Sequence, residues 1–218
     1  MASTGSQVER DVVVFGAGGQ VGRAVVAEAR RRGLAVTAAV RDPERHRDLA
    51  GEGVALVRCD VTDEAAVAAT ARGHAAAVST VYTPDVPSTP FYAAATGALV
   101  AGLDAAGSAD WSTWASPPRW RPRPASPSTT TPPSPRRTAP SPRPRPRARP
   151  APRVRRRPRL GGGHPALDLD RTAPGTGRYR TGGPQVLGDR IAQADLAVAV
   201  VDQLTTPAHH REQIAVAE

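Results

Sequence analysis

The stretch DVVVFGAGGQVGRAVVAEARRRG, residues 11–33, combines three local patterns in a fixed order. Asp11–Phe15 is a short, apolar, β-branched run of the kind that forms a strand buried on both faces. A glycine cluster follows, and from Val21 to Arg32 the apolar residues recur on one helical face while arginines occupy the other. Gly33 then supplies a helix stop. The stretch predicts a strand, a glycine turn and a helix.

The same alternation continues along the chain. Further strands are predicted at Leu34–Val40, Val54–Val57 and Ala75–Val81, and helices after Asp42-Pro43 and Thr62-Asp63. Strands that alternate with helices at this spacing require parallel pairing with right-handed crossovers. The predicted fold class is α/β, a Rossmann-type doubly wound parallel sheet.

The first turn predicts a phosphate site. Its glycines, Gly16, Gly19 and Gly22, have the spacing GxxGxxG, and Gln20 and Val21 would lie in the first turn of the helix. A turn without side chains lets a pyrophosphate approach the backbone N–H groups at the positive end of the helix dipole. The alternative is a glycine-rich loop that binds nothing.

The end of the second strand predicts which dinucleotide is bound. A carboxylate there holds the ribose 2′-OH of NAD(H), whereas an arginine pairs with the 2′-phosphate of NADP(H). This chain has Arg41, which favours NADP(H) over NAD(H). The alternative is that Arg41 is a solvated loop charge beside Asp42.

The ends of the next two strands complete the predicted site. Asp60 and Val61 would lie beside the adenine, although Asp60 could equally be a loop residue before a helix. Thr80 should border the crevice for the ribose and nicotinamide, because ligands bind at the carboxyl ends of parallel strands. Cys59, the only cysteine, reads as a small buried hydrophobe rather than a nucleophile.

The segments VVVFGAGGQVGRAVVAEARRRGLAVTAAVRDP and CDVTDEAAVAA resemble the NAD(P)H-binding atypical short-chain dehydrogenase/reductase family, which includes NmrA-like proteins and flavin- or biliverdin-reductase-like enzymes. The resemblance covers roughly residues 10–107 and resumes in Arg171–Gly183 and Arg190–Leu204. In the late part, Asp195 would begin a helix and EQIAVAE would form a last strand. The resemblance implies hydride transfer to a small molecule, or dinucleotide sensing without turnover.

The middle of the chain has a different composition. Trp111–Leu160 holds 15 of the 23 prolines and 14 of the 29 basic residues, with no Asp or Glu. A segment with so few large apolar residues is expected to be disordered. The predicted organisation is a dinucleotide-binding half at residues 1–107, a Pro/Arg-rich disordered or frameshifted segment at 108–163, and the rest of the Rossmann domain at 164–218.

A frameshift would explain this change. If one G is restored before Ser108, and Ser108 is encoded by TCN, the other frame encodes an apolar strand that ends in glycine, as the family resemblance requires. The reconstruction does not hold if Ser108 is encoded by AGT or AGC. On this hypothesis the chain lacks a strand, its sheet is interrupted after residue 107, and poor solubility is expected. A genuine arginine-rich insertion that binds nucleic acid is the disfavoured alternative.

Composition limits the remaining possibilities. The chain contains no lysine, so the Tyr-x-x-x-Lys pair of short-chain dehydrogenases cannot form, and the catalytic residues stay unknown. The histidines do not have the spacing of a metal site. One cysteine and no long apolar run favour a cytoplasmic protein without a membrane span. A small-molecule substrate of unknown identity is expected, and the sequence does not indicate the oligomeric state.

Overall fold

The computed structural model describes residues 11–82, 88–107, 110–114, 159–165, 168–183, 185, 187–206, 208–209 and 213–218. All of them belong to one compact unit, formed by residues 1–118 and 157–218. The second unit, residues 119–156, lies outside the described residues, and so does the prediction of disorder there.

The first half of the chain alternates strands and helices as the sequence predicts through β4, whereas α3 was not among the predicted helices. The elements are β1 (Asp11–Phe15), α1 (Gln20–Arg31), β2 (Ala35–Val40), the 3₁₀ helix η2 (Pro43–Leu49), β3 (Val54–Arg58), α2 (Glu64–Ala71), β4 (Ala76–Ser79) and α3 (Ser88–Ala106). Two of the helices begin at aspartates. Asp42 accepts a hydrogen bond from the Glu44 N–H, and Asp63 accepts from the N–H groups of the first turn of α2.

The second half adds β5 (Asp110–Trp114), β6 (Arg159–Pro165), β7 (Asp168–Asp170), β8 (Arg180–Gly182), β9 (Arg190–Ala192), α4 (Gln193–Thr205) and β10 (Gln213–Ala217). The predicted last strand is confirmed as β10. The helix predicted to begin at Asp195 is α4, which begins at Gln193 and has Asp195 in its first turn.

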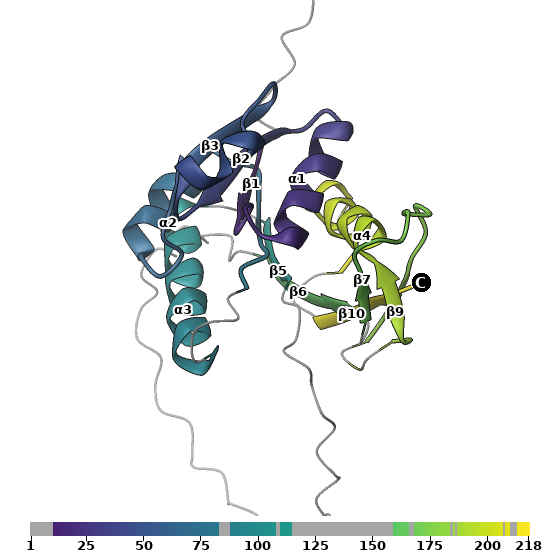
Figure 1. The fold of residues 1–218 in the computed structure, drawn as a ribbon. Helices are drawn as coiled ribbons and strands as arrows, with labels where there is room; N and C mark the ends of the chain where they lie inside the picture. Colours follow the sequence, from purple (N-terminus) through teal and green to yellow (C-terminus); the bar gives the residue numbers. More distant parts are fainter. Residues whose placement is uncertain are drawn as a thin grey trace, which may run out of the picture. The chain divides into compact units, whose positions relative to one another are not determined.

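The main sheet has the strand order β3-β2-β1-β4-β5-β6-β10-β8. Every neighbouring pair is parallel except β10 and β8, which are antiparallel. Helices α2 and α3 cover one face, and α1 and α4 cover the other (Figure 1). This arrangement confirms the doubly wound α/β Rossmann-type fold.

The expected loss of a strand after residue 107 is wrong. β5 continues the sheet beside β4, with Ala76 opposite Asp110, and β6 continues it beside β5. β5 lies inside the segment 108–163, which was predicted to be disordered or frameshifted, and β6 begins inside it and extends to Pro165. Backbone hydrogen bonds form the ladder whatever the side chains are, so a sequence without an apolar alternation can still supply a strand.

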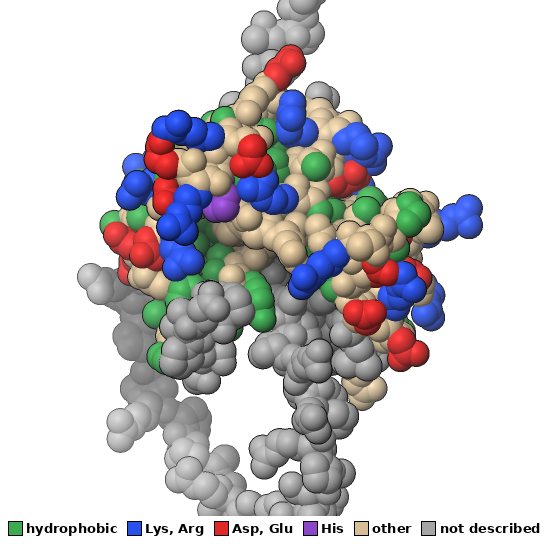
Figure 2. Space-filling model, viewed as in Figure 1, with side chains coloured by type: hydrophobic (Ala, Val, Ile, Leu, Met, Phe, Trp, Pro, Cys, Tyr) green, Lys and Arg blue, Asp and Glu red, His purple; other side chains and the backbone are tan. Residues whose placement is uncertain are grey.

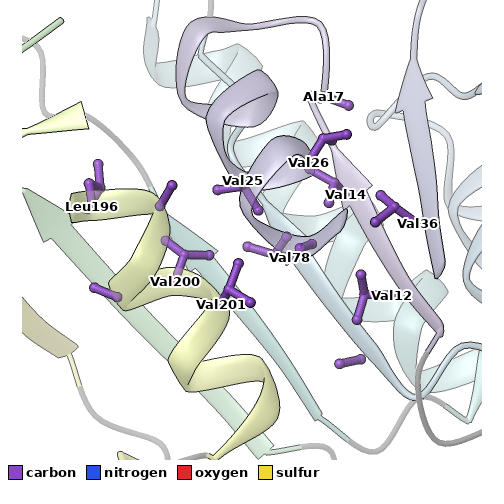
Figure 3. Packing of buried hydrophobic residues seen from close by; sticks show 14 of the residues in the cluster. Val12, Val14, Ala17, Val25, Val26, Val36, Val78, Leu196, Val200 and Val201 are labelled. Atoms are coloured by element: carbon purple, nitrogen blue, oxygen red, sulfur yellow. The ribbon is translucent and has the colours of Figure 1, made fainter. Parts of the chain in front are cut away.

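The hydrophobic core has two layers because alternate residues of each strand face opposite sides of the sheet. Val12 and Val14 of β1 pack with the α1 and α4 side, whereas Val13 and Phe15 pack with the α2 and α3 side. Figure 3 shows the first layer, in which Val25 of α1 lies near residues of α4. The labelled α4 residues are Leu196, Val200 and Val201. The two halves of the chain therefore share one core.

Candidate dinucleotide site

The glycine turn after β1 is packed tightly between its neighbours. Gly16 has a φ of +79°, which favours glycine, and its N–H donates to the Ala39 carbonyl at 3.1 Å. A Cβ on Gly16 would lie 3.0 Å from the Val81 nitrogen. The turn is thus fixed against the carboxyl ends of β2 and β4, where the predicted ligand would bind.

Gly22 lets α1 approach this turn. A Cβ at Gly22 would lie 2.3 Å from the Gly16 carbonyl oxygen and 2.8 Å from the Ala17 Cα. Gly19 differs, because a Cβ there would meet only the Gly16 oxygen, at 3.3 Å. Gly16 and Gly22 therefore serve the close packing of turn and helix, whereas Gly19 keeps the backbone open at the start of α1.

The N-terminus of α1 has the features of an anion site. Gly19 is the N-cap and offers no side-chain cap, and the first turn contains no acidic residue. The first intrahelical bond runs from the Arg23 N–H to the Gly19 carbonyl at 2.9 Å, so the N–H groups of Gln20, Val21 and Gly22 precede the helical ladder. Such a set of N–H groups, with the helix dipole behind it, suits a pyrophosphate. The N-terminus of α1 therefore fits the pyrophosphate of the predicted dinucleotide.

Gln20 and Val21 also contact the rest of the domain. The Gln20 carbonyl accepts a hydrogen bond from the Gln193 side chain at 2.9 Å, which joins the first turns of α1 and α4. Val21 is half-buried and packs against the core layer on the α1 side. Their side chains thus support the helix, while their backbone N–H groups remain the predicted ligand contacts.

Thr80 lies beside the turn at the end of β4, but its hydroxyl is directed to the backbone. It is 6 % exposed, and its Oγ1 lies 3.2 Å from the Phe15 carbonyl and 3.3 Å from the Gly16 carbonyl. One hydroxyl proton shared between these oxygens holds the turn from beneath. Thr80 is therefore a residue that positions the glycine turn, and its contact with a ligand stays a prediction.

Asp60 and Val61 lie in different environments, one exposed and the other buried. The Asp60 Oδ1 accepts from the Thr62 N–H at 2.9 Å and from its hydroxyl at 2.8 Å. These bonds lower the pKa of Asp60, and the nearby charge of Arg41 adds a smaller effect. Asp60 is exposed and therefore reachable by an adenine. Val61 is buried in the α2 and α3 core layer, so its side chain serves packing.

Arg41 is exposed at the carboxyl end of β2, as predicted. Its neighbour Asp42 is already engaged, because it caps η2 through Glu44 and forms an ion pair with Arg45 at 3.2 Å. Within the described ranges, no ion pair is recorded for Arg41 itself. Figure 2 shows basic side chains around a histidine on one face of the molecule, near the part that Figure 1 labels β2 and β3.

The sequence did not predict two residues beside the turn, Arg23 and His46. Arg23 of α1 donates from Nε to the Gly18 carbonyl at 3.2 Å, forms an ion pair with Asp48, and lies with Nη2 3.2 Å from His46 Nδ1. The His46 ring of η2 fills the space beside Gly18. No spacing pattern could have identified this contact, because Arg23 and His46 are joined only by the crossover from α1 through β2.

Cys59 is buried, as expected, with 2 % of its surface exposed. Burial raises the pKa of its thiol. In the described part of the chain, no three His, Cys, Asp or Glu side chains form a group that could hold a metal. No described helix is both long and apolar enough to cross a membrane.

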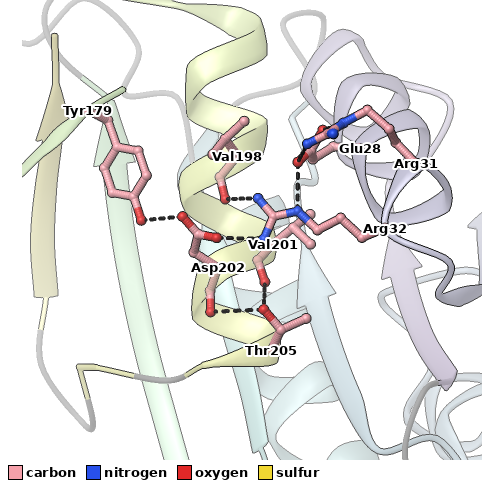
Figure 4. A network of polar contacts seen from close by, with 8 residues as sticks. All are labelled: Glu28, Arg31, Arg32, Tyr179, Val198, Val201, Asp202 and Thr205. Carbon is pink, nitrogen blue, oxygen red and sulfur yellow. Dashed lines mark hydrogen bonds and ion pairs between the residues drawn. The ribbon is translucent and has the colours of Figure 1, made fainter. Parts of the chain in front are cut away.

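The C-terminal part is tied to α1 by a polar network (Figure 4). The Arg32 guanidinium at the end of α1 pairs with Glu28 at 2.7 Å and with Asp202 of α4 at 2.5 Å. Tyr179, which precedes β8, donates its hydroxyl proton to Asp202 at 2.6 Å. Burial and the Asp202 carboxylate raise the pKa of Tyr179 to about 12. The network fixes α4 alongside α1.

A second contact from α4 holds the loop before β8. The Asp195 carboxylate is fully buried and accepts from the Thr176 N–H, the Thr176 hydroxyl and the Gly177 N–H, at 2.7–3.1 Å. Three donors compensate for the burial of this group. Asp195 therefore fixes a loop rather than reacting with a substrate.

Together, the fold and the glycine turn define a Rossmann-type domain with a candidate dinucleotide site at the start of α1. Residues 16–110 match the model of a family described as NAD(P)H-binding. The match runs from the glycine turn through α3 and covers 95 of the 218 residues. No curated protein matches the chain.

Solved structures are similar over nearly the whole described fold. A proposed epimerase from Bacteroides thetaiotaomicron has 22 % identity and a TM-score of 0.71, covering 95 % of this chain and 96 % of that one. A proposed NADH-flavin reductase from Streptococcus pneumoniae has 20 % identity and a TM-score of 0.66, covering 96 % and 99 %. An anaerobillin reductase from Escherichia coli O157:H7 has 16 % identity and a TM-score of 0.65, covering 95 % and 97 %. At these identities the similarity establishes the fold alone.

Proposed function

We propose that this chain binds NADP(H) in preference to NAD(H) and that it belongs to an oxidoreductase that reduces or oxidises a small molecule. The observation that carries the proposal is the uncapped N-terminus of α1 together with an exposed Arg41 at the end of β2. The names of the reductases among the similar structures support the same reaction class. When bound, the nicotinamide supplies or accepts the hydride.

The residues of this chain would bind and orient the dinucleotide. The N–H groups of Gln20, Val21 and Gly22 would hold the pyrophosphate, and Thr80 would keep the turn in place beneath it. Arg41 would pair with the 2′-phosphate through two parallel N–H bonds. Asp42 would not compete as an NAD-type carboxylate, because the cap of η2 and Arg45 already occupy it.

The test compares NADPH and NADH binding for the wild type, Arg41→Ala and Arg72→Ala. Arg72 is an exposed arginine at the C-cap of α2, so its replacement removes the same charge elsewhere. We expect Arg41→Ala to raise the Kd for NADPH about 10-fold or more and the Kd for NADH about 2-fold or less. Arg72→Ala should resemble the wild type. Equal affinity of the wild type for both dinucleotides would contradict the proposed preference.

A second candidate function is dinucleotide sensing without turnover. It rests on the lack of lysine, which excludes the Tyr-x-x-x-Lys pair, and on the absence of an identified catalytic residue. NADPH oxidation in the presence of flavins and quinones separates the two functions. Oxidation that depends on the acceptor supports the oxidoreductase, whereas tight binding without oxidation supports the sensor.

The single cysteine is consistent with the cytoplasm as the proposed compartment. Nucleic-acid binding through the Pro/Arg-rich segment is the least favoured proposal, since that segment lies outside the described residues. RNA binding that weakens steeply as the salt concentration rises would support nucleic-acid binding.

A further inference from the structure

We infer that His46 is a specificity-determining residue, whose imidazole N–H donates to the 2′-phosphate of the bound dinucleotide next to Arg41. The inference rests on the proposed function and adds a second recognition group to the same site. It starts from the contact between η2 and the glycine turn, which brings together residues that the sequence separates.

The His46 ring takes the place of a side chain at Gly18. A Cβ on Gly18 would lie 2.4 Å from His46 Nε2, 2.6 Å from Cε1 and 2.7 Å from Cδ2. Contacts this short do not occur between a real Cβ and a ring. Gly18 is therefore required for His46 to lie against the turn, and Nε2 is the ring atom nearest to it.

Arg23 determines where the His46 proton is. A guanidinium only donates hydrogen bonds, so His46 Nδ1, 3.2 Å from Arg23 Nη2, must accept. We therefore assign the proton to Nε2 from the hydrogen-bond partner of Nδ1. The ring presents an N–H donor on the side of the glycine turn.

Arg23 is held in this orientation by its other contacts. Its Nε donates to the Gly18 carbonyl at 3.2 Å, and Asp48 pairs with the guanidinium. Since Asp48 already offsets its charge, Arg23 serves to orient His46 rather than to bind phosphate. Because Arg23 is paired with Asp48, the N–H of His46 is the donor that we propose for the phosphate beside the glycine turn.

The position of His46 matches the adenosine ribose. In a Rossmann domain the ribose lies between the first turn and the end of the second strand. Gly18 lies in that turn, Arg41 lies at the end of that strand, and His46 follows Arg41 by five residues and lies against Gly18. A 2′-phosphate offers only acceptor oxygens, which suits the His46 N–H and the Arg41 guanidinium together.

The experiment measures the Kd of 2′,5′-ADP and of 5′-AMP, with NADPH and NADH as full-length probes. It compares the wild type with His46→Ala, His46→Gln, Arg23→Ala and the control Arg47→Ala. Arg47 is an exposed arginine of η2 paired with Glu44. We expect His46→Ala to lower the preference for 2′,5′-ADP over 5′-AMP about 10-fold, and Arg47→Ala to change it about 2-fold or less.

Two further readouts distinguish recognition from a purely structural role. His46→Gln keeps an N–H donor and should recover part of the preference, and Arg23→Ala should lose part of it with His46 intact. In nitrogen NMR spectra, the wild-type ring should show the proton on Nε2, and its signal should shift when 2′,5′-ADP binds but not when 5′-AMP binds. Thermal unfolding of each variant identifies any that fails to fold.

An unchanged preference in a folded His46→Ala variant would overturn the inference while leaving the proposed function intact. Tighter binding of both nucleotides by that variant would also overturn it, because the ring would then obstruct the site. A wild type that binds 2′,5′-ADP no more tightly than 5′-AMP would contradict the NADP(H) preference itself, and with it the inference.

Discussion

Gly22 shows how one missing side chain shapes the site. A Cβ there would lie 2.3–2.9 Å from the Gly16 oxygen, the Ala17 Cα and the Thr80 Oγ1. Two of these atoms belong to the backbone of the glycine turn, which cannot move aside without changing the candidate site. The helix therefore reaches the turn only because residue 22 has no side chain.

We predict that Gly22→Ala lowers the free energy of unfolding by about 1–3 kcal/mol and weakens dinucleotide binding. The matched control is Gly97→Ala in α3, where a Cβ would meet nothing within 4 Å. That change should leave binding unaltered and stabilise the protein by about 0.5–1 kcal/mol, because alanine favours a helix. Urea unfolding and NADPH titration measure both effects. Equal behaviour of the two variants would contradict the packing argument.

At the scale of elements, α4 organises the C-terminal part through two aspartates. Asp195 in its first turn fixes the loop that contains Thr176 and Gly177, and Asp202 near its end binds Arg32 and Tyr179. The Asp195 residue is buried, whereas the Asp202 side chain is 38 % exposed. Their expected contributions to stability therefore differ.

Replacing Asp195 with alanine should lower the free energy of unfolding by about 2 kcal/mol or more, because the loop loses three hydrogen bonds to a buried carboxylate. Asp189→Ala is the control, since Asp189 is exposed and should change stability by about 0.5 kcal/mol or less. Hydrogen exchange at the Thr176 and Gly177 N–H groups should accelerate in the first variant only. Protection that persists in Asp195→Ala would show that other contacts hold the loop.

The Tyr179 contact predicts a dependence on alkaline pH. Its pKa rises from an ordinary value of 10.0 to about 12 in the folded protein, so folding favours the neutral phenol. The associated stability is fully present below about pH 10 and is lost as the pH rises toward 12. The wild type should therefore lose stability over this interval more steeply than Tyr179→Phe. Phenolate absorbance gives the titration, and identical pH profiles would exclude the contact.

At the scale of the whole molecule, the two halves of the described fold depend on each other. Val25 of α1 belongs to the same core layer as Leu196, Val200 and Val201 of α4. The sheet also runs without a break from β3 to β8. The dinucleotide half therefore exposes part of its core when α4 is missing.

We predict that a fragment ending at residue 118 shows no cooperative thermal transition, and that adding a fragment of residues 157–218 restores one. These boundaries follow the compact unit, which combines both ranges. Circular dichroism measures the transition, and the intact chain is the control. A cooperative transition in the first fragment alone would show that the dinucleotide half folds by itself.

The elements predicted correctly from the sequence have signals within a few residues of one another. Asp11–Phe15, the glycine turn and the caps Asp42 and Asp63 act over one strand or one helical turn, so composition and spacing suffice. The strands β5 and β6 were missed because Asp110–Trp114 and the residues of β6 lack an apolar alternation. Pairing with the neighbouring strands β4 and β10 places them in the sheet.

The sequence by itself determined the alternation of strands and helices, the glycine turn and the basic residue at the end of β2, because each depends on local conformational preference. Only the tertiary structure decided that Thr80 faces the backbone, that Val61 is core, and that His46 and Arg23 meet at Gly18. Those contacts join segments far apart in the chain. Their formation depends on how the sheet and its crossovers pack, which no local pattern encodes.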